Sequence, residues 1–133
     1  MRHLRENSLA VAAVVFVGAN LLHTADHIRQ GLGGLSATVL AGGTMLTLLA
    51  VVVAAMALRE HPRAAPYAAV VGFSGAVGIA ASHLAPHWSS LSDPYPDLSV
   101  DALSWAVMFA EIAAALVLGI VALRELARQP QHA

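Results

Sequence analysis

Two short stretches of the sequence carry histidines with the same spacing. His23 and His27 flank Thr-Ala-Asp, and sixty positions later His83 and His87 flank Leu-Ala-Pro. On a helix, residues four apart lie one turn above each other on the same face, so each pair can bind a single ion. Imidazole suits transition metals, whereas calcium and magnesium prefer oxygen ligands. We therefore predict that these four histidines bind a transition metal, unassigned among zinc, copper and iron.

Polar residues beside the first pair extend the predicted site. Asn20 and Asp26 lie within about a third of a turn of the two histidines, at roughly 100° per residue. Asp26 is included among the predicted metal ligands, although it can instead accept a ring N–H of a histidine and fix its orientation. It can also form an ion pair with Arg29, three residues further on. The sequence leaves these three roles open.

A polar stripe also marks the last apolar stretch, where Asp101, Ser104, Met108 and Glu111 recur at spacings of three and four. A helix that enters the membrane near residue 99 places Glu111 roughly 18 Å deep, close to mid-bilayer. A carboxyl group at that depth must be neutral, paired or hydrated. We predict that Glu111, Asp101 and Asn20 handle protons or support the metal ligands. Asp101 alternatively serves only as an acidic group in the first turn of its helix.

The second histidine pair is less regular than the first. Pro86 removes a backbone donor and disfavours helix at the residue before it, so His87 can lie beyond the helix end. His83 is the safer ligand of this pair. Asp93 and Asp97 follow in a proline-containing loop and are predicted to be solvated. The remaining histidines are predicted to be exposed: His3, His61 and His132.

The elements that must position these residues follow from the composition. Of the 133 residues, 58% are hydrophobic and 11% are charged, with a mean hydropathy of +0.69, whereas soluble domains have roughly 25% charged residues. Four apolar runs, at about 8–28, 36–58, 66–86 and 99–123, can each span a bilayer. Backbone N–H and C=O groups without hydrogen-bond partners are very costly in hydrocarbon, so each run is expected to be helical. We predict an all-α, four-helix transmembrane bundle that forms a single integral membrane domain, 1–133. The first run is expected to be a retained span rather than a cleaved signal peptide.

Other features of the composition narrow the chemistry. The sequence has no cysteine, which excludes thiolate metal sites and cysteine nucleophiles. It has no cluster of basic residues and a net charge of −1, so no nucleic acid partner is expected. All seven basic residues are arginine, a bias that fits a GC-rich bacterial genome and hence a bacterial inner membrane. Five glycines are predicted to mark close helix contacts: Gly42, Gly43, Gly72, Gly75 and Gly78.

The arginines predict the orientation in the membrane. Six of them lie at the N-terminus, in the second connection or at the C-terminus, and only Arg29 lies at the opposite end of the helices. The positive-inside rule then places both termini in the cytoplasm. The first and third helices therefore run outward, and their histidines share one depth within roughly 10 Å of the outer surface.

The two halves of the sequence, 1–65 and 66–133, also resemble each other. Leu-Ser opens the second and fourth apolar runs, at 35–36 and 98–99, and Ala-Leu-Arg-Glu closes them, at 57–60 and 122–125. We predict two repeated helical hairpins related by an axis along the membrane normal. Leu46 stands where Glu111 stands in the other half, so the predicted symmetry breaks at that carboxylate.

Three functions are compatible with these features. The first is a small polytopic membrane metalloprotein with a redox or metal-handling role. A haem held by two histidines ranks below a directly ligated ion, because it would leave one histidine of each pair idle. The second is a cation or proton transporter or channel that uses Glu111, and the third is a structural subunit of a membrane complex. The expected partners are the lipid bilayer and a homodimer or larger membrane complex. No catalytic motif of a hydrolase, kinase or nicotinamide enzyme occurs, so the sequence names no reaction and leaves open whether the protein is an enzyme.

Overall fold

The computed structural model describes residues 8–31 and 35–128. Over these residues the chain forms four long helices, α2 (Ser8–Gln30), α3 (Ala37–Leu58), α4 (Ala64–His83) and α5 (Ala102–Arg128), and one short 3-10 turn, η2 (Tyr95–Asp97). Each long helix is long and apolar enough to cross a membrane. The predicted all-α architecture of four membrane-spanning helices is confirmed, and the chain has the character of a multi-pass membrane protein.

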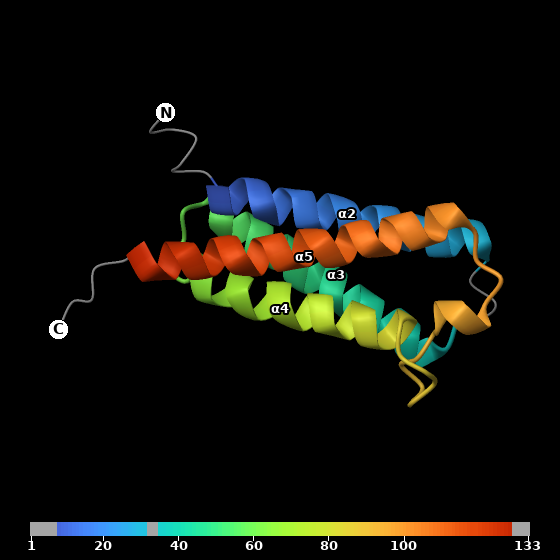
Figure 1. The fold of residues 1–133 in the computed structure, drawn as a ribbon. Helices are drawn as coiled ribbons and strands as arrows, with labels where there is room; N and C mark the ends of the chain where they lie inside the picture. The colour runs from blue at the N-terminus through green and yellow to red at the C-terminus, as the bar shows by residue number, and fades with distance from the viewer. Residues whose placement is uncertain (1–7, 32–34, 129–133) are drawn as a thin grey trace.

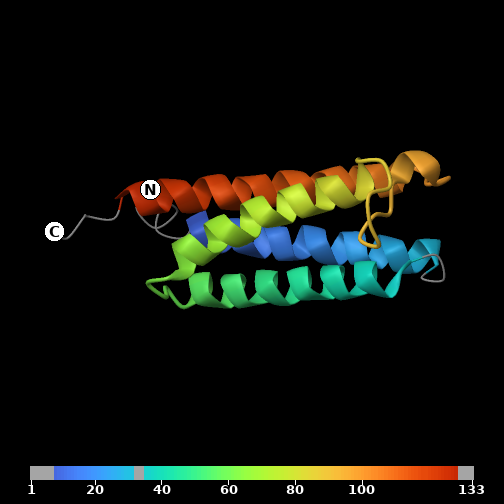
Figure 2. The ribbon, with the colours of Figure 1, turned by 90° about the horizontal axis from the view of Figure 1, so that it is seen from below.

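The four helices form an up-down-up-down bundle (Figures 1 and 2). Contacts join α2 to α3, α3 to α4, α4 to α5 and α5 back to α2. Helices α2 and α4 therefore run in one direction, and α3 and α5 run in the other. The C-terminal ends of α2 and α4 therefore place the two histidine-bearing stretches at the same end of the bundle, as the sequence predicted. Which side of a membrane this end faces, and whether the two hairpins are repeats, stay predictions.

Local chemistry explains the helix ends near the site. The Ser36 hydroxyl accepts a hydrogen bond from the Val39 N–H at 3.1 Å and caps α3, as short polar side chains do at helix N-termini. Helix α4 ends at His83, three residues before Pro86, which cannot continue the helical hydrogen bonding. Helix α5 begins at residue 102 rather than 99, because the Asp101 carboxylate accepts the Ser104 N–H at 3.0 Å and caps the helix.

Small residues bring α4 and α5 close together. A Cβ added to Gly72 would lie 2.6 Å from the Gly119 backbone nitrogen, and one added to Gly75 would lie 3.3 Å from the Leu46 side chain. The predicted close approach is therefore confirmed at these two α4 glycines, and a Cβ on Gly42 would just touch a leucine of the loop after α4. The prediction is wrong at Gly43 and Gly78, where an added Cβ would meet nothing within 4 Å.

Helix α3 has fully buried residues in only one of its halves. Its buried residues are Ala50, Val53, Ala54 and Ala57, all in the second half. The first half, 37–49, contains no buried residue, and Figure 2 shows α4 diverging from α3 towards that end. The bundle is thus tightly packed at the end that contains the 58–64 turn and looser between α3 and α4 at the histidine end.

Candidate metal centre

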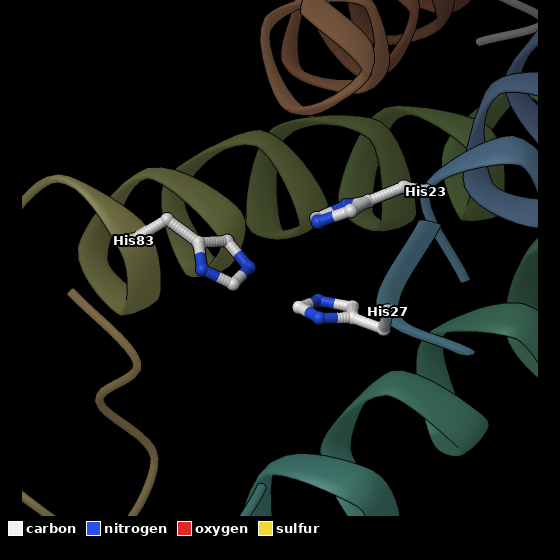
Figure 3. Close-up of side chains that lie close together, drawn as sticks. All are labelled: His23, His27 and His83. Atoms are coloured by element: carbon white, nitrogen blue, oxygen red, sulfur yellow. The ribbon is translucent and has the colours of Figure 1, made fainter. Parts of the chain in front are cut away.

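Three histidines converge at one end of the bundle (Figure 3). His23 and His27 come from the last two turns of α2, and His83 is the last residue of α4. One ring nitrogen from each lies within 4.8 Å of the corresponding nitrogens of the other two. The ring centroids are 4.6 Å apart for the α2 pair, and the His83 ring lies 5.0 Å and 5.4 Å from the other two. His23 and His83 are buried and His27 is partly exposed, so the cluster faces inward with one accessible side.

The fourth predicted ligand lies outside this cluster. His87 is exposed and is not a member of the three-histidine group. The predicted pairing of His83 with His87 required a helical i, i+4 spacing, and α4 ends before that spacing can form. The chain at Pro86 has left the helix, which is the physical reason for the difference.

A buried carboxylate holds His23 from the side opposite the cluster. Glu111 on α5 is only 1% exposed and its Oε2 atom forms a short contact with His23 Nδ1. Its other oxygen accepts a hydrogen bond from the Asn20 amide nitrogen at 2.6 Å, and the Asn20 oxygen accepts one from the Thr47 hydroxyl at 2.6 Å. When Glu111 accepts the Nδ1–H of His23, the lone pair of this histidine is on Nε2, the nitrogen available to a ligand. Helices α2, α3 and α5 thus fix one imidazole together.

His83 is held by the loop that follows α4. Its Nδ1 atom lies 3.0 Å from the backbone carbonyl oxygen of Asp93. A carbonyl can only accept, so Nδ1 carries the proton and Nε2 carries the lone pair. The Asp93 side chain is 13% exposed and one of its oxygens lies 4.0 Å from the same nitrogen. Burial raises the pKa of this carboxyl group. Asp93 is therefore part of the site rather than a solvated loop residue, whereas Asp97 is exposed as predicted.

Tyr95 is a site residue that the sequence analysis did not identify. The side chain is 1% exposed, and its hydroxyl oxygen lies 3.2 Å from His23 Nε2. Its ring lies 4.5 Å from the His83 ring and meets Trp105 edge-to-face at 5.5 Å. Burial raises the pKa of the Tyr95 hydroxyl to about 12, so it remains a neutral donor at physiological pH. The one signal in the sequence is a tyrosine between two prolines, which fits a fixed turn but does not indicate where the ring points.

Asp26 belongs to a second polar network at the outer edge of α2 and α5. Its oxygens accept hydrogen bonds from Arg29 at 2.8 Å and from Gln30 at 2.6 Å. Arg29 also pairs with Asp101 at 2.9 Å and donates to the Ser104 hydroxyl at 3.1 Å. The Ser104 backbone N–H and the Arg29 guanidinium lower the pKa of the Asp101 carboxyl. Of the roles left open for Asp26, the structure shows the ion pair with Arg29. Arg29 links α2 to the start of α5 through Asp101 and Ser104, and neither carboxylate joins the histidine group.

A cavity of about 620 Å³ adjoins the cluster. His23, His27 and His83 line it together with Asn20 and Glu111, and most of the remaining lining comes from apolar residues of α3 and α4. Such volumes are typical of sites for small molecules. The imidazoles therefore border a space large enough for a ligand beyond the metal itself.

The fold and the site together define a four-helix bundle of the membrane type with a largely buried three-histidine cluster. Comparison of the chain with protein-family models, with curated proteins and with solved structures found no match. The chemistry of the site is accordingly argued from its own geometry.

Proposed function

We propose that this protein is a cell-membrane metalloprotein that binds one transition-metal ion through His23, His27 and His83 and has a redox or metal-handling role. The observation that carries the proposal is the convergence of one nitrogen from each ring to within 4.8 Å of the others. Nitrogens bonded to one ion at about 2.0–2.1 Å lie roughly 3.4 Å from each other in a tetrahedral site. Side-chain movements of about an ångström therefore close the site, and imidazole donors suit zinc, copper or iron.

The groups behind the rings support ligation rather than simple packing. Glu111 contacts Nδ1 of His23 and the Asp93 carbonyl contacts Nδ1 of His83, so the lone pair of each of these two histidines is on Nε2. Metal-binding histidines usually have such an acceptor on the second ring nitrogen, because it fixes the tautomer and the ring orientation. In the described part of the chain no hydrogen bond joins any two of the three histidines. We attribute their convergence to a shared ion.

The number of ligands favours a reactive site over a purely structural one. Structural zinc sites usually have four protein ligands, whereas catalytic sites have three and keep one position open. Here the three histidines border the cavity, so an exogenous ligand can reach the fourth position. When bound, the ion would supply Lewis-acid or electron-transfer chemistry. Glu111 and Asn20 orient the His23 ring, and the Tyr95 hydroxyl holds a proton beside its Nε2 atom.

A transport role for Glu111 receives less support. Both oxygens of this carboxylate have protein partners, Asn20 and His23. Towards the far end of the bundle the same face of α5 continues with fully buried apolar residues, Ala115, Leu118 and Ala122. A proton or cation path needs polar groups or water beyond the carboxylate. The arrangement therefore favours a site that is closed on that side. The arginine distribution supports placing the metal end on the outer face of the membrane.

Metal content of the purified protein tests the proposal. The full chain would be incubated with zinc, copper or iron in detergent, freed of excess ion and measured by elemental analysis. We expect about one ion per protomer for one of the three metals, and loss of that ion in His23→Ala and His83→Ala. The matched control is His87→Ala, because His87 lies on the same stretch but is exposed and outside the cluster. A parent protein that binds no ion, or an equal loss in His87→Ala, would refute the site.

A further inference from the structure

The cavity beside the histidines lies between two diverging helices. Its walls come mainly from the first half of α3 and the second half of α4, including Leu40, Leu46, Val77 and Ile79. No residue of that half of α3 is buried, and Figure 2 shows α3 and α4 separating there. Both helices belong to the set that is long and apolar enough to span a membrane. The side of the cavity between α3 and α4 therefore faces the bilayer interior.

The end of the cavity towards the loops is covered. Trp88 and Leu91, from the loop after α4, line it. The Trp88 indole donates to the Ala81 carbonyl at 2.9 Å, and the Ser36 hydroxyl donates to the Ser90 carbonyl at 2.6 Å. These bonds hold the loop across the cavity from α4 to α3. A ligand consequently has an apolar route from the side and an apolar cover towards the loop end.

The polar end of the cavity has hydrogen-bonding groups but no cation. The lining contains neither lysine nor arginine, and its polar side chains are Asn20, Glu111, the three histidines, Thr24, Thr44, Thr47, Ser74 and Ser82. Arg29 is engaged by Asp26 and Asp101 and is not part of the lining. In the metal-free site, an anionic head group would meet the Glu111 carboxylate with no lysine or arginine to compensate its charge, which is unfavourable in a buried site. The head group that fits is neutral.

The aromatic surfaces at this end favour a flat head group. The His23 and His27 rings are stacked, with centroids 4.6 Å apart and planes inclined by 28°, and the Trp88 side chain lies in the same lining. Planar rings gain additional stabilisation from such surfaces. Carbonyl or hydroxyl oxygens on the ring can pair with the amide, hydroxyl and imidazole groups nearby.

From these features we infer that the cavity binds a neutral, lipid-soluble molecule of the quinone class. The molecule enters from the bilayer between α3 and α4, places its oxygen-bearing ring beside His23 and His27, and leaves its hydrocarbon tail along the apolar walls. This inference rests on the proposed function for the role of the bound ring at the metal. The binding itself is measured separately from metal content.

Fluorescence of Trp88 provides a direct test. The chain has two tryptophans, and only Trp88 lines the cavity, so Trp105→Phe leaves a single reporter at the site. A quinone with a ten-carbon tail, decylubiquinone, would be titrated into this variant in detergent. We expect saturable quenching, both in the protein treated with a chelator and in the metal-loaded protein.

Glycines in open space allow a matched set of cavity-filling variants. A Cβ at Gly43 or Gly78 would meet nothing within 4 Å, and both residues line the cavity. A Cβ at Gly18 also meets nothing, but this glycine is exposed on α2 away from the cavity. Gly43→Leu and Gly78→Leu should weaken quinone binding by about tenfold or more, since the added side chains occupy the ligand volume. Gly18→Leu should leave the Kd unchanged.

The outcomes separate this inference from the proposed function. Quenching that rises linearly without saturation, or a Kd unaffected by both cavity-filling variants, would overturn the quinone site while leaving the metal result intact. If decanoate displaced decylubiquinone at concentrations near the Kd of the quinone, the neutral head group would be overturned. If monodecanoyl glycerol did so, the assignment to the quinone class would be overturned. Saturable quenching in a protein that binds no metal would support the quinone site and would count only against the metal centre.

Discussion

Glu111→Gln isolates the contribution of the buried carboxylate to the metal site. The substitution keeps the size of the side chain but replaces the charged acceptor behind His23 Nδ1 with a neutral amide. If the amide oxygen keeps the bond from Asn20, its NH2 group faces His23 and favours the tautomer with the proton on Nε2. That nitrogen then has no lone pair for a metal. The site would retain only His27 and the loop-held His83 as competent ligands.

The magnitude follows from the lost interaction. A hydrogen bond to a charged group contributes about 1.5–3 kcal/mol, which corresponds to roughly 10–100-fold in a dissociation constant. The same range is typical when the partner of a metal-binding histidine is removed. Because Glu111 is 1% exposed, water does not replace the lost acceptor. We therefore expect Glu111→Gln to weaken metal binding by about 10–100-fold.

Competition with a chromophoric chelator measures this change. Zinc affinity would be compared among the parent, Glu111→Gln and the control Glu125→Gln, which alters a carboxylate on the same helix that faces Arg128 instead of the cluster. Thermal unfolding of the metal-free proteins would show whether the bundle remains folded. A Glu111→Gln affinity within threefold of the parent, in a folded protein, would refute the idea that this carboxylate sets the His23 tautomer.

Three further perturbations test other contacts. Tyr95→Phe removes the hydroxyl that competes with a metal for His23 Nε2, so zinc affinity should rise about 2–10-fold by chelator competition; a loss of more than tenfold would instead make the Tyr95 oxygen a ligand. Gly72→Ala forces a Cβ against the α5 backbone and should destabilise the bundle by about 1–3 kcal/mol in detergent unfolding, whereas Gly78→Ala in open space should not. The lowered pKa of Asp101 means that its stabilisation is present above the ordinary carboxyl pKa and is lost as the pH falls through the lowered value. The melting temperatures of the parent and Asp101→Asn should therefore converge below about pH 4, and a constant difference at all pH values would contradict this assignment.

The helices and the first half of the site could be predicted because they depend on local pattern. Each of the four apolar runs of bilayer length must form an α-helix in hydrocarbon to pair its backbone groups, and the structure has helices at those runs. The i, i+4 spacing of His23 and His27 fixes their common face once α2 is helical. Glu111 could be singled out because a carboxylate so deep in an apolar helix needs a partner, and the structure provides that partner as His23.

The rest of the site depends on chain segments that no periodicity describes. The loop of residues 84–101 supplies the Asp93 carbonyl and the Tyr95 hydroxyl, and the direction of a loop side chain is set by tertiary packing. The spacing of His83 and His87 matches that of the first pair and therefore predicts a second pair on one helix face. A single proline, Pro86, removes the helical geometry on which this prediction depends, so His87 lies outside the cluster. Asp26 could not be assigned either, since its position allowed a role on the metal side and one on the Arg29 side.

The different surroundings of α3 and α5 bear on both proposals, the metal site and the quinone cavity. The sequence opens and closes these two helices with similar residues, yet they pack differently. Helix α5 presses against α4 through Gly72 and Gly119 and carries the carboxylate that fixes His23. Helix α3 has Leu46 at the corresponding position, and that residue lines the cavity. A rigid support on one side keeps the imidazoles oriented. A second charged, tightly packed helix in place of α3 would close the apolar route, so the proposed metal site and the proposed lateral access both depend on the asymmetry between the two helices.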